Sequence, residues 1–256
     1  MDAGLNLYSI RQLVNSGQDF FDVCDKLKKM GYAYLQISGL PLKAEEIAQV
    51  SREKELPVYL THSPLDRILN DTDAVLEENA AFGCKNIGLG YLPPKIIADE
   101  RTCKETLEKL NGIAEKIEKN GFTFFLHHHQ NEFFKYGNQT VMDFILENMP
   151  AFHFIIDTYW LQYGGVNVEK FFEKLKGRAE CIHLKDYRIA LQNGSSVSFA
   201  PQYAPVGAGT LDFFAIVQAA KKAGTKYFFV EQDDAGEYPD PLAQVEESIR
   251  FIREKL

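Results

Sequence analysis

Cysteine is scarce in this chain, and the few cysteines present do not form pairs. Cys24, Cys84, Cys103 and Cys181 lie far apart, with no Cys-x-x-Cys spacing. Neither a disulfide framework nor a thiolate zinc site is indicated. We therefore expect each cysteine to be a small buried apolar residue.

Long apolar runs and an excess of positive charge are also missing. No stretch approaches the ~18 uninterrupted apolar residues of a membrane span, and the first residues, MDAGLNLYSIRQLV, lack the features of a signal peptide. Lys and Arg number 28 against 36 Asp and Glu, giving a net charge of −8, so no surface for nucleic acid or an anionic membrane is indicated. We expect a cytoplasmic protein, and the sequence leaves the formation of a homo-oligomer open.

What is present is the composition of a globular protein, with 45% apolar residues among 256. Short segments rich in β-branched and aromatic residues alternate with longer amphipathic segments, many of which end at glycine. The eight strand candidates are LNLY from Leu5, YAYLQIS from Tyr32, PVYLTH from Pro57, NIGLG from Asn86, FTFFLHHH from Phe122, FHFIID from Phe152, AECIHLK from Ala179 and KYFFVE from Lys226.

Eight β-then-α units predict an α/β protein, a parallel (β/α)8 barrel formed by residues 1–256 as a single domain. An open doubly wound sheet is the structural alternative. No GxGxxG follows the first strand, so dinucleotide binding has no support. One long connection, from Tyr187 to Gly209, follows the seventh strand, and we expect it to be a lid or binding loop.

The active site of such a barrel lies at the carboxyl ends of its strands. Strands five to eight end in HHHQNEF, IIDTYW, CIHLKDY and FVEQDD, which supply Glu132, Asp157, His183 and Glu231. Neighbouring strands lie ~4.8 Å apart, so these side chains can converge. Oxygen and nitrogen donors without sulfur suit Mn²⁺, Mg²⁺, Co²⁺ or Zn²⁺. The sequence therefore predicts a divalent metal ion, although a strand-capping role explains any one of the four residues alone.

Side chains alternate between the faces of a strand. With His183 inward, Cys181 and Lys185 face inward too, and in strand five His127 and His129 share one face while His128 takes the other. We expect substrate contacts from the polar and aromatic residues around the mouth, with two of them placed across it from the metal. These substrate candidates are His62, Gln36, His127 and Trp160, and of them Gln36 and His62 are the two expected across the mouth.

Five motifs together resemble the sugar phosphate isomerase/epimerase superfamily of xylose isomerase-like TIM barrels, over nearly the whole chain. They are LHHHQNEF at 126–133, similar to YHNHxxEF in that family, then DTYWLQYGG at 157–165, HLKDY at 183–187, PVGAGTLDF at 205–213 and VEQD at 230–233. His128 stands where asparagine is common, and Ala208 stands where glutamate is common. These departures bear on the substrate more than on the fold.

The resemblance implies the same metal ligands that the strand ends select, namely Glu132, Asp157, His183 and Glu231. It also implies enolisation, in which a metal ion acidifies the proton α to a sugar carbonyl and a base removes it. In epimerases of the family two glutamates exchange protons with opposite faces of the enediolate, and Glu132 and Glu231 match them. His129 is the rival base, as in related lyases, and Lys185 can stabilise the developing oxyanion.

The sequence thus predicts a metal-dependent isomerase or epimerase of a small sugar. A lyase or dehydratase acting on a keto-sugar or keto-inositol uses the same enolate and is the alternative. A non-catalytic sugar-binding barrel is disfavoured by the complete ligand set. An endonuclease is disfavoured by the acidic charge balance.

Overall fold

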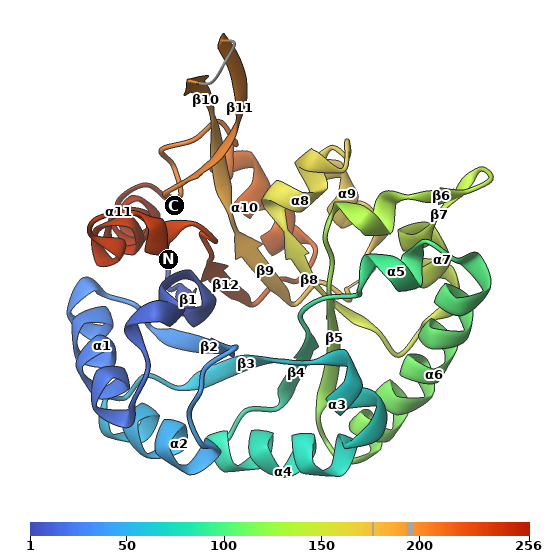
Figure 1. Cartoon of the computed structure of the whole chain (residues 1–256), viewed down its shortest axis with the longest axis horizontal. Coiled ribbons are helices and arrows are strands. Elements are labelled where there is room, and N and C mark those ends of the chain that lie inside the picture. The colour runs from blue at the N-terminus through green and yellow to red at the C-terminus, as the bar shows by residue number, and fades with distance from the viewer. Residues whose placement is uncertain (176, 194–196) are drawn as a thin grey trace.

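The computed structural model describes residues 1–175, 177–193 and 197–256. Eight parallel strands close into a barrel, in which β12 pairs with β1. Figure 1 shows the barrel surrounded by helices. The prediction of a (β/α)8 barrel is confirmed, and the open sheet is wrong. The barrel strands are β1 Gly4–Asn6, β2 Tyr34–Ser38, β3 Val58–Ser63, β4 Asn86–Leu89, β5 Thr123–His127, β8 His153–Asp157, β9 Cys181–Leu184 and β12 Tyr227–Val230.

One or two helices follow almost every barrel strand and cover its outer surface. They are α1 Gly17–Met30, α2 Ala44–Glu53, α3 Leu65–Asn70, α4 Thr72–Phe82, α5 Pro94–Ile97, α6 Glu100–Lys119, α7 Val141–Asn148, α8 Thr158–Tyr163, α9 Val168–Phe171, α10 Phe213–Lys222 and α11 Pro241–Lys255. Short 3-10 segments span Leu7–Leu13, Gln130–Phe133, Phe172–Lys174 and Ala235–Glu237, and a small antiparallel pair is formed by β6 Lys135–Tyr136 and β7 Gln139–Thr140.

The helix boundaries follow from local chemistry. Helix α1 begins after Ser16, whose hydroxyl accepts a hydrogen bond from the Asp19 amide, and it ends at Gly31 in the left-handed conformation. The four cysteines are buried, as expected. No helix in the described part of the chain is both long and apolar enough to cross a membrane.

The expected loop from Tyr187 to Gly209 is instead largely an antiparallel hairpin of β10 Asp186–Asn193 and β11 Val197–Ala204, which projects from the barrel (Figure 1). The sequence analysis did not recognise these two strands, although the alternation in YRIAL and VSFAPQY favours them. The expected role of this connection as a lid or binding loop stays a prediction. The three residues 194–196 of that connection lie outside the described residues.

Asp186 anchors the base of this hairpin. Its carboxylate accepts hydrogen bonds from the backbone amides of Tyr187, Gly207, Gly209 and Leu211. A Cβ on Gly209 would come within 2.3 Å of the Asp186 carboxylate, so only glycine permits this approach. The motif PVGAGTLDF therefore folds around one buried acidic side chain.

Candidate functional site

Two layers of inward-facing side chains fill the barrel, one above the other. The lower layer is apolar and consists of Tyr34, Leu60, Phe125, Ile155, Cys181 and Phe229. Because strand side chains repeat every two residues, the next inward layer lies two positions further along each strand. That layer is polar and consists of Gln36, His62, His127, Asp157, His183 and Glu231. The change from apolar to polar therefore occurs at one level, near the carboxyl ends of the strands.

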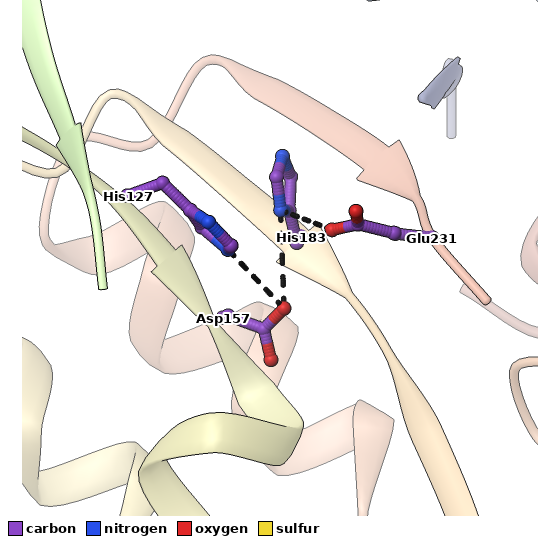
Figure 2. Close-up of side chains that lie close together, drawn as sticks. All are labelled: His127, Asp157, His183 and Glu231. Atoms are coloured by element: carbon purple, nitrogen blue, oxygen red, sulfur yellow. Dashed lines mark ion pairs between the residues drawn. The ribbon is translucent and has the colours of Figure 1, made fainter. Parts of the chain in front are cut away.

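Four side chains of the polar layer bring their donor atoms together. One ligand atom each from His127, Asp157, His183 and Glu231 lies within 4.8 Å of the others (Figure 2). His127 Nε2 is 3.5 Å and His183 Nδ1 is 3.8 Å from Oδ2 of Asp157. His183 Nδ1 is 2.5 Å from Oε2 of Glu231. All four residues are buried.

Apart from their ion-pair contacts with one another and with Lys185, these converging atoms have no hydrogen-bond partner although they are buried. They are His127 Nε2, Asp157 Oδ2, His183 Nδ1 and Glu231 Oε2. Buried polar atoms are normally paired, so four such atoms around one point need a common partner. Metal–donor bonds of about 2.1 Å place neighbouring donors roughly 3.0–3.4 Å apart. The separations of 2.5, 3.5 and 3.8 Å within this cluster lie around that range. The donors fit a divalent cation with two nitrogen and two oxygen ligands.

The hydrogen bonds of both histidines leave the converging nitrogens free. His183 Nε2 lies 2.8 Å from Oε1 of Gln36, and His127 Nδ1 lies 3.0 Å from the carbonyl oxygen of Gly90. Each oxygen accepts a hydrogen bond from the ring N–H beside it. The other ring nitrogen then carries the lone pair that binds a metal ion. Gln36 was expected across the mouth, but it lies directly against His183.

The carboxylates are held by partners on their outer oxygens. Oδ1 of Asp157 accepts a hydrogen bond from the Trp160 amide, which makes Asp157 the N-terminal cap of α8. Oε1 of Glu231 accepts a hydrogen bond of 2.9 Å from the side chain of Asn6. The second oxygen of each carboxylate is thereby directed to the cluster.

Lys185 neutralises part of this negative charge. Its ammonium lies 3.3 Å from Asp157, 3.5 Å from Glu231 and 3.1 Å from Asp233. Burial alone would lower the pKa of Lys185, but these three carboxylates hold it well above its usual value. The lysine is therefore a fixed positive charge beside the four donors.

The carboxylates of the cluster are ionised. Burial alone would raise the pKa of Asp157 and Glu231, but Lys185 and the adjacent histidines hold both well below the usual range. Burial lowers the pKa of His183, which keeps its ring neutral. Burial would also lower the pKa of His127, but the contact with Asp157 raises it. A divalent cation bound by both side chains would supply positive charge to Asp157 in place of a proton on His127.

Glu132 is not one of the four converging groups among the residues described. Its Oε2 accepts a hydrogen bond of 2.9 Å from the His129 amide, while Oε1 is buried without a partner. Burial raises the pKa of Glu132 to about 7. The expected role of Glu132 as a metal ligand stays a prediction, and His127, expected to contact substrate, takes the position among the donors.

A cavity of about 910 Å³ opens beside the cluster at the mouth of the barrel. Of the expected substrate residues, His62 and His127 line it, whereas Gln36 and Trp160 do not. Three of the four expected catalytic residues, His129, Lys185 and Glu231, also line the cavity. Trp160 instead packs its ring 5.0 Å from that of His129.

His129 presents a neutral ring to the cavity. Burial, together with His127 and Lys185, lowers its pKa to about 2, and its Nδ1 is buried without a partner. His128 faces away, as predicted, with its ring 5.7 Å from that of Phe133. The alternation expected for strand five is therefore confirmed.

Asn6 and Asp233 were missed by the sequence analysis. Asn6 ends the first barrel strand and Asp233 follows Glu231 by two residues. The sequence contains the pattern that identifies both residues, because inward-facing side chains repeat every two positions along a strand. This repeat leads from Gly4 to Asn6 and from Glu231 to Asp233. Asn6 belongs to the first strand, outside the strand ends five to eight that supplied the candidate ligands, and Asp233 lies one inward position beyond Glu231.

Comparison with known proteins agrees with the fold. Residues 13–255 match the model of a family described as xylose isomerase-like TIM barrel. The fold is similar to that of a sugar phosphate isomerase/epimerase from Parabacteroides distasonis, with a TM-score of 0.81, 20% identity, and 99% of this chain and 98% of that chain covered. A search of curated proteins finds no match.

Two further solved structures share the fold. A probable 3-DHS dehydratase from Bacillus anthracis has a TM-score of 0.76 at 13% identity and covers 100% of both chains. An L-ribulose 3-epimerase has a TM-score of 0.72 at 14% identity, with 99% of this chain and 94% of that chain covered. At these identities the likeness shows the fold alone.

Proposed function

Because the chain belongs to the xylose isomerase-like TIM barrel family, we propose that it is a divalent-metal-dependent isomerase or epimerase of a small sugar. The observation that carries this proposal is the cluster of four buried donor atoms without partners beside an open cavity. The reaction moves the proton on the carbon next to the sugar carbonyl.

The metal ion would be held by His127, Asp157, His183 and Glu231, a set of two nitrogens and two oxygens that suits Mn²⁺, Co²⁺ or Zn²⁺, with Mg²⁺ also compatible with the carboxylates. When bound, such an ion polarises the sugar oxygens and lowers the pKa of the α proton. Glu132 remains the competing fourth ligand.

We assign the two proton transfers to Glu231 and Glu132, of which Glu231 lies in the cavity wall. Glu231 lines the cavity, and its Oε1 is oriented by Asn6, so we assign it one face of the substrate. Glu132, with a pKa raised to about 7, has a suitable affinity for the second proton. Lys185 lies at the cavity wall as a fixed positive charge, where it stabilises an oxyanion.

Elimination by a lyase or dehydratase is the second candidate, and one observation favours it. The ring of His129 lines the cavity, whereas Glu132 does not. In that reaction His129 would take the α proton and a leaving group would depart from the β carbon. The two reactions share the metal site and differ in the base.

The test is proton exchange in D₂O, followed by NMR with the metal-loaded protein and a panel of keto- and aldo-sugars. We expect deuterium at the carbon next to the carbonyl with at least one sugar. Glu231→Gln should abolish exchange at restored metal occupancy, and His129→Ala should be milder if the enzyme is an isomerase or epimerase. Greater damage from His129→Ala, with exchange coupled to loss of a leaving group, would favour elimination. Full exchange in both variants would contradict both assignments.

A further inference from the structure

The cavity is larger than the substrate of the proposed reaction requires. Its volume is about 910 Å³, near the upper end of the 300–1,000 Å³ found for ligand pockets. A water molecule takes about 30 Å³ in the liquid, so the twelve heavy atoms of a free hexose fill at most about 360 Å³. More than half of the cavity therefore extends beyond a hexose placed at the four donors.

The wall of the cavity contributed by α3 and by the segment after β4 is mostly apolar, and its polar members are Asp66, Asn70 and Lys95. Leu65 and Leu69 stand four residues apart on one face of α3, while Ile68 between them is fully buried in the core. The two leucines are half-buried and border the cavity. The other apolar residues of this wall are Leu89, Tyr91, Pro93 and Ile96.

Tyr91 connects this wall to the reacting groups. Its ring lies edge-on to that of His129, with centroids 5.2 Å apart, and 45% of its surface is exposed. The apolar wall is therefore continuous with the catalytic end of the same cavity. A flat apolar group placed beside Tyr91 has an aromatic ring available for contact.

A free sugar gains little from such a wall. Hydroxyl groups surround a hexose, and each one placed against leucine or isoleucine loses water without gaining a hydrogen bond. An aromatic or alkyl substituent on the sugar would instead bind favourably to this wall, because its apolar surface is buried away from water.

We infer that the substrate is a keto-sugar that carries a flat apolar substituent, a keto derivative of an aryl glycoside, whose substituent binds against Leu65, Leu69 and Ile96. This inference rests on the proposed function, since it places the sugar at the four donors. The apolar wall is then a specificity subsite.

The test compares binding of phenyl and methyl glucosides, both anomers of each, by calorimetry. With manganese-loaded protein we expect the phenyl glucoside of one anomer to bind at least tenfold more tightly than the matching methyl glucoside. Leu69→Asn should reduce this ratio to about threefold or less. The matched control is Leu146→Asn, at a half-buried leucine on α7 that does not line the cavity, and it should keep the ratio.

A second measurement keeps the inference testable if Leu69→Asn fails to fold. In the wild-type protein the phenyl protons should show nuclear Overhauser contacts to methyl groups of Leu65, Leu69 and Ile96. Equal binding of phenyl and methyl glucosides, no binding of either, or phenyl contacts elsewhere would overturn the inference.

The outcomes also separate this inference from the proposed function. Exchange of the α proton in D₂O without a phenyl preference would sustain the enzyme and remove the subsite. A phenyl preference that disappears in Leu69→Asn, in a protein that exchanges no proton with any sugar, would sustain the subsite and contradict the enzyme.

Discussion

At the residue scale, two side chains compete to be the fourth ligand beside Asp157, His183 and Glu231. The sequence favours Glu132, whereas the structure brings His127 to the cluster. Loss of a residue that only hydrogen-bonds a metal ligand typically weakens metal binding by about 10–100-fold. We predict that His127→Ala, which removes a ligand itself, weakens Mn²⁺ binding by at least this much. Glu132→Gln should change it less than threefold. Calorimetric metal titration of the two variants checks this, and the reverse order would restore Glu132 as the ligand.

Glu132 also makes the stability of the metal-free protein depend on pH. Its pKa rises from 4.5 to about 7 because the carboxyl is buried. The folded state therefore holds this proton more tightly than the unfolded state, and the stability this provides at low pH is lost as pH rises from about 4.5 to 7.

The free energy of unfolding of the wild type should thus fall by up to roughly 3 kcal/mol relative to Glu132→Gln across this range, and level off above it. Urea unfolding of both proteins in EDTA, at several pH values, measures the difference. Parallel curves from pH 4 to 8 would show that the Glu132 carboxyl does not hold its proton in this way.

At the scale of elements, one acidic residue holds the hairpin of β10 and β11 to the barrel. Four backbone amides donate to the Asp186 carboxylate. Asp186→Ala leaves these amides without an acceptor, and we predict a loss of about 2–4 kcal/mol in the free energy of unfolding.

Hydrogen exchange locates the effect of this change. Amides of residues 205–211 should lose protection from hydrogen exchange in Asp186→Ala. Amides of α1, which is far from this segment in the sequence, should keep theirs. Asp186→Asn retains one acceptor oxygen, so protection of these amides should be intermediate between the wild type and Asp186→Ala. Unchanged protection of residues 205–211 in the alanine variant would show that the segment is held by other contacts.

The strands were predictable from sequence because each is a short β-branched and aromatic segment bounded by turn residues. The hairpin was not recognised, although Ile189, Leu191 and Phe199 alternate with other residues as in a strand. These side chains are exposed, so burial does not explain their pattern. A search for strands guided by the core passes over such a projecting element.

The site was predictable in part for a related reason. Asp157, His183 and Glu231 each lie within one residue of the end of a strand, at the level of the polar layer, so strand position alone selects them. Glu132 lies beyond the end of β5, in a 3-10 segment whose backbone turns the side chain toward the His129 amide. Strand alternation says nothing about the direction of a side chain in that turn. The sequence analysis therefore assigned the ligand position to Glu132 and a substrate contact to His127.

At the scale of the whole molecule, closure of the barrel brings Asn6 of the first strand to Glu231 at the end of the last. Pairing of β1 with β12 makes this contact between residues 225 positions apart. The site is therefore a property of the closed barrel. It unites the four converging side chains, from the ends of β5, β8, β9 and β12, with an orienting residue from β1 and another from β2.

We propose that one divalent ion binds among His127, Asp157, His183 and Glu231. This proposal is tested most directly by anomalous diffraction from crystals of the protein grown with Mn²⁺. We predict one anomalous peak per chain, about 2.0–2.3 Å from His127 Nε2, Asp157 Oδ2, His183 Nδ1 and Glu231 Oε2. No peak at the barrel mouth at millimolar Mn²⁺, or a peak that contacts none of these four atoms, would contradict the account.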